Sequence, residues 1–419
     1  MAPNLIGSTF LIAETAITNN DANNNKQATL AQTTCKTSNN DRVPNQGEPA
    51  ALMRQNAAKP QAQLQLQTKT ETPTHKPYKL EIVWFNVMLF VVLHSMAFYG
   101  IYLIYAENAY LEFVISYLYA MLGGLGITAG VHRLWSHRAY KARLPLRIFL
   151  MLCQSLAFQN SIYEWCRDHR VHHKFTDTNA DPHNSGRGFF FAHMGWLMCK
   201  KHSDVTERGK NVDMSDILAD PVVRFQKKYY FLVMPICCFV IPAIIPYFVL
   251  GSSLKVCFFV CSMLRYTISL HATWLVNSAA HFYGMRPYEK NISSVDSKAV
   301  AIIAFGEGWH NYHHVFPWDY KAGELGTYQY NWTTAFLDFM AYIGQAYDLK
   351  SVPKEMILKR VQRTGDGTHL SVKDINNNNL SELVSKLDHD KEETMVWGWD
   401  DTDVCEDDRK DALHVGKVE

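Results

Sequence analysis

The stretch IVWFNVMLFVVLHSMAFYGIYLIY, residues 82–105, is almost uninterrupted by charge. A helix of this length can cross a hydrocarbon core of about 30 Å. Three similar stretches follow at 111–130, 229–250 and 254–276, and only a few residues separate the members of each pair. We therefore predict two helical hairpins in a membrane. Buried core helices of a soluble bundle are the weaker alternative, because length and hydrophobicity coincide in all four stretches.

The distribution of basic residues predicts the orientation of these hairpins. The hairpin tips are poor in Lys and Arg, whereas the region between the hairpins carries Arg133, Arg138, Lys141, Arg143, Arg147, Arg167, Lys174, Lys200 and Lys201. By the positive-inside rule this side faces the cytosol, and both termini share it. The net charge of +1 argues against a nucleic-acid binder.

The two ends of the chain differ in composition from the middle. Residues 1–77 are rich in Asn, Gln, Ala and Thr, and the segment 368–419 is acidic. Such compositions cannot bury a core, so we predict disorder for both ends and one membrane domain over 78–367. The expected fold class is an all-α integral membrane protein with four spans and a cytosolic helical cap.

Nine histidines gather in clusters on the predicted cytosolic side. They are His132 and His137, then His169, His172 and His173, then His281, and finally His310, His313 and His314. Neutral imidazole is the commonest metal-binding side chain, and nine ligands are too many for one ion. We predict two metals in an all-nitrogen shell, each with one open position. Any single histidine could instead be a surface residue or a core hydrogen-bonding residue.

The spacing within the clusters refines this hypothesis. In the two triplets the first and last histidines are four apart, so on a helix all three imidazoles lean toward one side. His132 and His137 are five apart, which does not follow one helical stripe and indicates a bend or a second metal direction. No carboxylate lies between the histidines of a cluster and no Cys accompanies them in a finger-like spacing, so zinc-finger and zincin interpretations fit badly.

Four motifs together closely resemble the membrane acyl-CoA Δ9 desaturases, the stearoyl-CoA desaturase family. They are GITAGVHRLWSH (126–137), YEWCRDHRVHH (163–173), WLVNSAAH (274–281) and GEGWHNYHH (306–314). The resemblance extends from about residue 78 to 367, and it implies an enzyme of the endoplasmic reticulum membrane. Such an enzyme uses O2 and two electrons from cytochrome b5 to place a cis double bond in a saturated fatty acyl-CoA.

The resemblance also implies roles for particular residues. Two iron ions would be held by the nine histidines, with Asn277 completing the shell through a water. Asn277 and His281 are four apart and would share a helix face, although a helix-end hydrogen bond is an equally good interpretation of Asn277 alone. The acyl-CoA carrier would contact Asn86, Arg167, Asp168, Lys200, Lys201 and Trp274.

The acyl chain itself would lie in a bent tunnel. The resemblance places Gln159, Trp165 and Thr273 at the bend, and Ala120 and Gly124 at the closed end, where mammalian members carry Tyr and Ala. The smaller side chains predict tolerance of longer or differently shaped acyl chains. Simple helix packing is the alternative for Ala120 and Gly124, as ordinary packing is for Trp165 and a solvated face is for the lysine pair.

Several polar residues near the clusters invite further interpretation. Glu164, Asp168, Glu307 and Asp319 could accept the remaining N–H groups of ligand histidines, or could form surface salt bridges. His94 and His271 lie within predicted spans and are not counted as ligands. Arg265, also within a span, must face protein, water or an interface.

Four alternatives to a Δ9 desaturase stay open. A desaturase of other regioselectivity or a membrane di-iron hydroxylase would use the same ligands. A catalytically silent membrane scaffold is a different class, and the complete ligand set argues against it. A zinc protein is conceivable, since imidazole also binds zinc.

Overall fold

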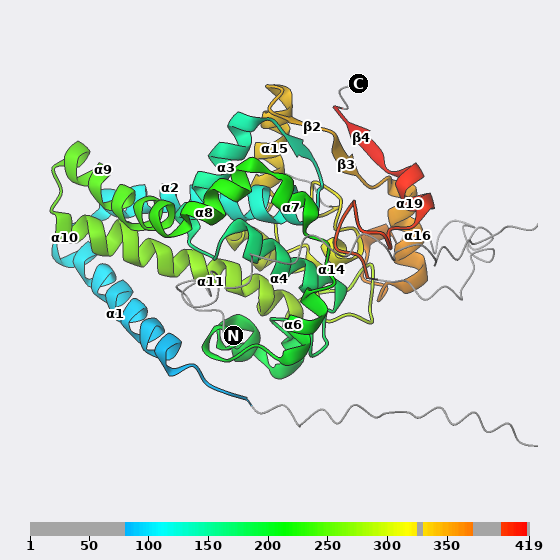
Figure 1. Cartoon of the computed structure of the whole chain (residues 1–419), viewed down its shortest axis with the longest axis horizontal. Helices are drawn as coiled ribbons and strands as arrows, with labels where there is room; N and C mark the ends of the chain where they lie inside the picture. Colours follow the sequence, from blue (N-terminus) through cyan, green and yellow to red (C-terminus); the bar gives the residue numbers. More distant parts are fainter. Residues whose placement is uncertain (1–79, 325–329, 372–394, 417–419) are drawn as a thin grey trace, which may run out of the picture. The chain divides into compact units, whose positions relative to one another are not determined.

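The computed structural model describes residues 80–324, 330–371 and 395–416. Segments 1–79 and 372–394 lie outside this part of the chain, so the disorder predicted there is not tested. The described residues are mainly helical, as predicted, with a few very short strands (Figure 1).

Four helices among the described residues are long and apolar enough to cross a membrane. The first is α1 (Trp84–Ala106), and the second is α2 (Tyr110–Leu125) continued by the π-helical segment η1 (Gly126–Ser136). The third consists of α8 (Pro221–Pro235), the π-helical turn η4 (Ile236–Val240) and α9 (Ile241–Leu250). The fourth consists of α10 (Leu254–Val256), the π-helical segment η5 (Cys257–Leu264), α11 (Arg265–Asn277) and the short α12 (Ala279–Phe282). The prediction of four spans is confirmed.

Three of these spans are longer than the apolar stretches that predicted them. The second helix continues over residues 131–136, the third begins at Pro221, and the fourth reaches Phe282 after a break at Ser278. The added turns are more polar, and two of them carry predicted ligands, His132 and His281. Two of the candidate spans thus carry predicted ligand residues in their end turns.

Arg265 finds its partners inside the bundle. Its guanidinium is 1% exposed and donates to the carbonyl oxygens of Leu156 at 3.0 Å and Cys238 at 2.7 Å. Cys238 lies in the π-helical turn η4, where the altered hydrogen bonding leaves carbonyl groups available. Arg265 therefore faces protein. This agrees with the expectation that a charged residue within a span faces protein, water or an interface rather than lipid.

Shorter helices form the cap around the predicted site. They are α3 (Leu144–Ala157), α4 (Ile162–Lys174), α5 (Phe189–His193), α6 (Ser203–Gly209), α7 (Ser215–Ala219), α13 (Lys298–Ile303), α14 (His310–Val315), α15 (Trp332–Tyr342) and α16 (Lys354–Thr364), with 3₁₀ turns at Ser185–Arg187 and Gly195–Met198. The largest buried apolar cluster joins η1, α3 and α4. Gly126 permits this packing, because a Cβ there would overlap the backbone of Gln154.

Two antiparallel strand pairs complete the described chain. β1 (Lys141–Ala142) pairs with β2 (Ala346–Tyr347), and β3 (Leu349–Ser351) pairs with β4 (Leu413–Val415). β4 follows α19 (Glu406–Asp411) near the C-terminus (Figure 1). The sequence predicted disorder over 368–419, and this was wrong for residues 395–416. Composition pointed to a chain without a core of its own, but this segment packs on the core of the cap.

Candidate metal centre

The five-residue spacing of His132 and His137 is explained by the π-helical segment η1. In a π-helix each N–H bonds to the carbonyl five residues earlier, and the His137 N–H donates to the His132 carbonyl oxygen at 3.2 Å. The two rings consequently lie on the same side, with centroids 4.8 Å apart. The bend that the sequence required is a change of helix type, which often occurs at functional sites.

The two histidine triplets lie on α4 and α14, each held in place locally. The Ser161 hydroxyl caps α4 by accepting the Glu164 N–H at 3.3 Å. α14 is only six residues long, and Asn311 anchors it by donating to the carbonyl oxygens of Glu289 and Ser294 at 2.9 and 3.0 Å. The ligand residues thus stand on elements fixed by neighbouring polar groups.

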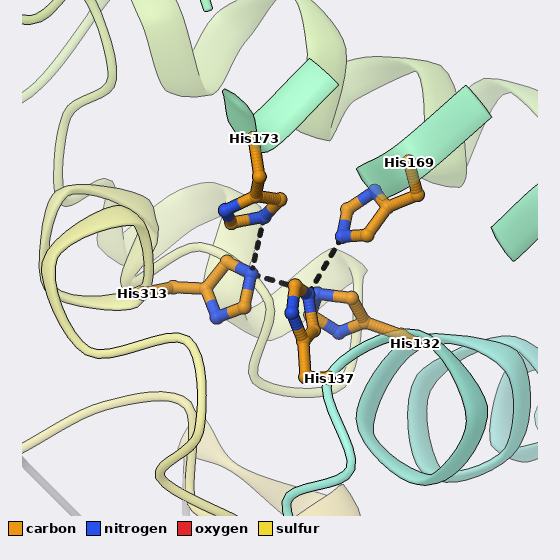
Figure 2. A group of neighbouring side chains, drawn as sticks. All are labelled: His132, His137, His169, His173 and His313. Carbon is orange, nitrogen blue, oxygen red and sulfur yellow. Dashed lines mark hydrogen bonds between the residues drawn. The ribbon is translucent and has the colours of Figure 1, made fainter. Parts of the chain in front are cut away.

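The nine histidines form two groups in which one ring nitrogen of each member lies within 4.8 Å of the others. The first histidine group is His132, His137, His169, His173 and His313 (Figure 2). The second histidine group is His172, His281, His310 and His314. The prediction that each triplet presents one ligand edge was too simple, because α4 and α14 each contribute to both groups.

Within each group the Nε2 atoms face one another. The distance is 2.8 Å between His137 and His169, 2.9 Å between His132 and His313, and 3.1 Å between His281 and His310. Figure 2 shows that the first group draws on three separate segments, whose rings converge on one point.

The outer nitrogens of four ligands have hydrogen-bond acceptors. Nδ1 of His132 lies 2.7 Å from Glu307, Nδ1 of His172 lies 2.8 Å from Asp181, and Nδ1 of His281 lies 2.6 Å from the Ser293 hydroxyl. Nδ1 of His137 faces the carbonyl oxygen of Trp397. A carbonyl or carboxylate can only accept, so the ring proton of a neutral imidazole belongs on Nδ1. The inward Nε2 atoms then carry no proton, and each has a lone pair that can bind a metal.

Electrostatics keep the rings of His169, His173 and His313 neutral. Burial lowers the pKa of His169, His173 and His313 well below its ordinary value, and repulsion from neighbouring imidazoles lowers it further. The lone pairs on the Nε2 atoms, which lie 2.8 to 3.1 Å apart, repel one another unless a cation lies among them. The donor set is therefore suited to a metal ion, and nitrogen ligands of this kind accept zinc, copper, iron and nickel.

Of the four acidic residues proposed to support ligands, only Glu307 contacts one. Glu307 also accepts from the buried Arg133 guanidinium at 2.8 Å. Asp168 pairs instead with Arg167 and Lys201, and Asp319 accepts from the Tyr312 hydroxyl at 2.9 Å. Burial raises the pKa of Glu164, which faces Lys227 rather than a histidine. Closeness in sequence was a poor guide, because side chains of adjacent helical residues point in different directions.

Sequence reasoning missed the supporting residues Asp181, Ser293 and Trp397. Asp181 lies nine residues after His172 in a loop, and its other oxygen accepts the Asp177 N–H at 3.2 Å. An acidic residue in a polar turn just after a histidine triplet is the signal that could have indicated it. Ser293 and Trp397 carry no such signal, because they are distant from the ligand clusters or contribute only a backbone carbonyl.

Asn277 is the last residue of α11, and its contact with a metal-bound water stays a prediction. The helix breaks at Ser278, where φ is −113° and ψ is −76°, so Asn277 and His281 do not share one continuous helix face as expected. Asn277 lines a cavity together with Asp168 and His169.

Two cavities meet beside the first histidine group. The larger, of about 340 Å³, is mostly apolar and is lined by Ala120, Gly124, Gln159 and Thr273, and it also reaches Glu307. The smaller, of about 80 Å³, also borders Gln159 and Thr273 and reaches His169. The Gln159 amide donates to the Thr273 hydroxyl at 2.9 Å where the two cavities adjoin.

The other predicted tunnel residues lie along these cavities. The ring of Trp165 stacks on that of His169 with centroids 4.7 Å apart. At the far end, a Cβ on Gly124 would lie 2.5 Å from the Phe305 ring. Phe305 thus occupies part of the space that the small residues leave open, a contribution the sequence did not indicate.

The residues predicted to contact the carrier are only partly at the surface. Lys200 is exposed and pairs with Glu81 at 2.5 Å, whereas Lys201 is mostly buried and pairs with Asp168 at 2.5 Å. Trp274 is buried and lines the smaller cavity. Asn86 is fully buried and donates to the Leu197 carbonyl at 2.6 Å, so it does not lie on the surface where the sequence analysis placed it.

Comparison with known proteins agrees with this arrangement. The fatty acid desaturase family model matches residues 108–331. The acyl-CoA Delta-9 desaturase of Acheta domesticus is 52% identical over 338 residues, which cover 81% of this chain and 87% of the relative. Stearoyl-CoA desaturase 5 of Bos taurus is 54% identical over 298 residues, which cover 71% of this chain and 88% of the relative.

The chain therefore belongs to the fatty acid desaturase family, a class of oxidoreductases, and the predicted family is confirmed. The similarity does not distinguish one bond position from another. The acyl-CoA Delta12-desaturase of Acheta domesticus is 53% identical over 329 residues, which cover 78% of this chain and 85% of that relative.

Proposed function

We propose that this protein is an acyl-CoA desaturase that introduces a cis double bond, at Δ9 in the first instance, into a saturated fatty acyl-CoA. The observation that carries the proposal is the pair of histidine groups, the first of which borders two adjoining cavities. The nine histidines would hold two iron ions, with Asn277 as a further ligand through water. Iron is preferred to zinc because removing hydrogen from a methylene requires a redox metal.

The overall reaction consumes O2, two electrons and two protons. It removes one hydrogen from each of two adjacent methylenes and releases two waters. Bound iron would supply the oxidant derived from O2. The protein's own residues hold the chain and exclude water, because no side chain can cleave an unactivated C–H bond.

The acyl chain would pass from the smaller cavity into the larger one. Gln159 and Thr273 would set the bend where the cavities adjoin, and Trp165 would place the chain beside His169. Outside the tunnel, Arg167 and Lys200 would attract the phosphates of the carrier. Asp168, which pairs with both Arg167 and Lys201, would hold these two cations beside it. Trp274 would border the carrier end of the smaller cavity and Asn86 would support that wall.

The two electrons would come from cytochrome b5, and the membrane would be that of the endoplasmic reticulum. The excess of Lys and Arg between the hairpins supports a cytosolic position for the cap and both termini. A cytosolic cap would be accessible to a soluble or membrane-anchored electron donor.

Expression in a desaturase-deficient cell, followed by fatty-acid analysis with localisation of the double bond, tests the reaction. The expected product is a cis-Δ9 alkene that requires cytochrome b5, with iron in the purified protein. His172→Ala should abolish it. A double bond at another carbon would identify a different regioselectivity, and an alcohol would identify a hydroxylase. A protein with zinc alone, or with no product, would contradict the proposal.

The closed end of the tunnel gives a prediction about chain length. Ala120→Tyr would fill part of the larger cavity, so the preferred acyl chain should become shorter by several carbons. The measurement is the product profile with acyl-CoA substrates of graded length. Val114→Tyr is the control, because Val114 lies on the same helix but is 55% exposed on its outer surface. An unchanged profile for Ala120→Tyr would reject this role.

A further inference from the structure

The C-terminal strap, residues 395–416, is not used by the function proposed above. It carries an acidic run and lies far from the ligand clusters in sequence. In the structure it nevertheless contacts all three segments that supply the first histidine group, namely η1 with its following residue His137, α4 and α14.

The contact with His137 is made by the backbone of the strap on both sides of Gly398. The Trp397 carbonyl accepts from His137 Nδ1, and the Trp399 N–H donates to the His137 carbonyl oxygen at 3.0 Å. Gly398 lies directly against His137, since a Cβ there would be 2.5 Å from its carbonyl oxygen and 2.7 Å from its Cα. Only a residue without a side chain allows this approach.

The contact with α4 uses an aromatic ring and carboxylates. The Trp397 ring lies 3.8 Å from the guanidinium carbon of Arg170, a fully buried residue that also donates to the Ser136 carbonyl at 3.1 Å. Asp401 accepts from Lys174 at the end of α4 at 2.9 Å and from the Trp397 N–H at 2.9 Å. Arg170 therefore joins α4 to η1 beneath the strap.

The strap is fastened at both of its ends. Val396 and Val404 pack in the apolar cluster that includes Tyr312 of α14. Near the C-terminus β4 pairs with β3, and His414 lies 2.7 Å from Asp348. These contacts hold a segment that could not fold alone, because it buries its apolar residues only against the cap.

We propose that the C-terminal strap is a positioning device for the first histidine group. Its Trp397 carbonyl fixes the proton of His137 on Nδ1 and so presents Nε2 as the ligand atom, while the packing around Gly398 fixes the ring's place. Trp397, Gly398 and Asp401 are the positioning residues. This inference rests on the proposed metal centre, and it adds that the first group is incomplete without the end of the chain.

Gly398→Ala in the full-length, iron-loaded protein tests the inference. The added methyl must displace the strap from His137, so one of the two irons should pass to a ferrous chelator about tenfold faster or more, as is typical when an outer partner of a ligand is lost. Gly209→Ala is the matched control, since its Cβ would meet Val171 at an ordinary 3.4 Å. Release at the wild-type rate, or equal acceleration of both irons, would overturn the inference.

A second pair of variants applies if Gly398→Ala does not fold. Trp397→Ala removes the ring over Arg170, and Trp397→Phe keeps an aromatic face there. Iron release should be faster for the alanine variant and close to wild type for the phenylalanine variant. Identical release from both variants contradicts the inference. A wild-type protein that holds no iron would instead refute the metal centre itself, so the two failures are distinguishable.

Discussion

The two histidine groups differ in both their ligands and their supports. The first has five imidazoles, backed by the Glu307 carboxylate and the Trp397 carbonyl, whereas the second has four, backed by Asp181 and the Ser293 hydroxyl. A metal in the second group would therefore have one histidine fewer than a metal in the first group. The comparison predicts that the second group holds its metal less tightly than the first.

The largest expected effect comes from removing one imidazole from each group. His281→Ala leaves three histidines in the second group, so this variant should lose about half of its iron and all product formation. His169→Ala leaves four in the first group and should keep more of its iron. Metal analysis of the purified variants measures the difference. Equal losses of iron from both variants would mean that the number of histidines in a group does not decide how tightly it holds its metal.

Replacing the carboxylates that support ligand histidines should have a smaller effect, and the two replacements should differ in their effect on stability. Asp181→Asn and Glu307→Gln each remove the negative partner of a ligand, which should weaken metal affinity about 10–100-fold. Glu307→Gln should also lower the free energy of unfolding by about 3 kcal/mol, because the buried Arg133 loses its carboxylate. Metal titration and denaturant unfolding separate the two quantities. Equal stability of both variants would show that Arg133 is satisfied by its other acceptors.

Asn277→Ala tests the role predicted for this amide beside the metal centre. If the amide only orients a water, iron content should stay unchanged while product formation falls about tenfold. Thr267→Ala is a control on the same helix, distant along the chain from the nine histidines of the two groups. Loss of iron from Asn277→Ala would instead identify the amide as a support of the centre as a whole.

The smallest expected effect is at the hydroxyl support. Ser293→Ala removes one neutral hydrogen bond to His281, a change of about 1 kcal/mol, so metal affinity should fall less than tenfold. The same titration as for Asp181→Asn measures it. A fall as large as that of the carboxylate variants would show that charge is not what distinguishes the supports.

Much of this architecture could be predicted from local patterns. Runs of apolar residues identified the four spans, and the histidine clusters identified nine residues that the structure brings together. The five-residue spacing of His132 and His137 even indicated an irregular helix, but hydropathy and spacing could not specify a π-helix, because its stability depends on packing against α3 and α4.

The acidic C-terminal segment shows what local sequence patterns could not predict. Composition predicted disorder for 368–419, yet residues 395–416 pack on the cap through contacts with His137, Arg170 and β3. The strand that pairs with β4 lies more than 60 residues away in sequence, as the pairing of Ser351 with Leu413 shows. A segment that folds only against another surface leaves little signal in its own composition.

The sequence by itself determined the four long apolar helices, the histidine clusters and the family, because each depends on residue types at short, regular spacings. Only the tertiary structure decided how α4 and α14 divide their histidines between two groups, and which of Glu307, Asp181, Ser293 and Trp397 holds each ring. These outcomes depend on how distant segments pack against one another, and packing is a property of the whole folded chain rather than of any one stretch.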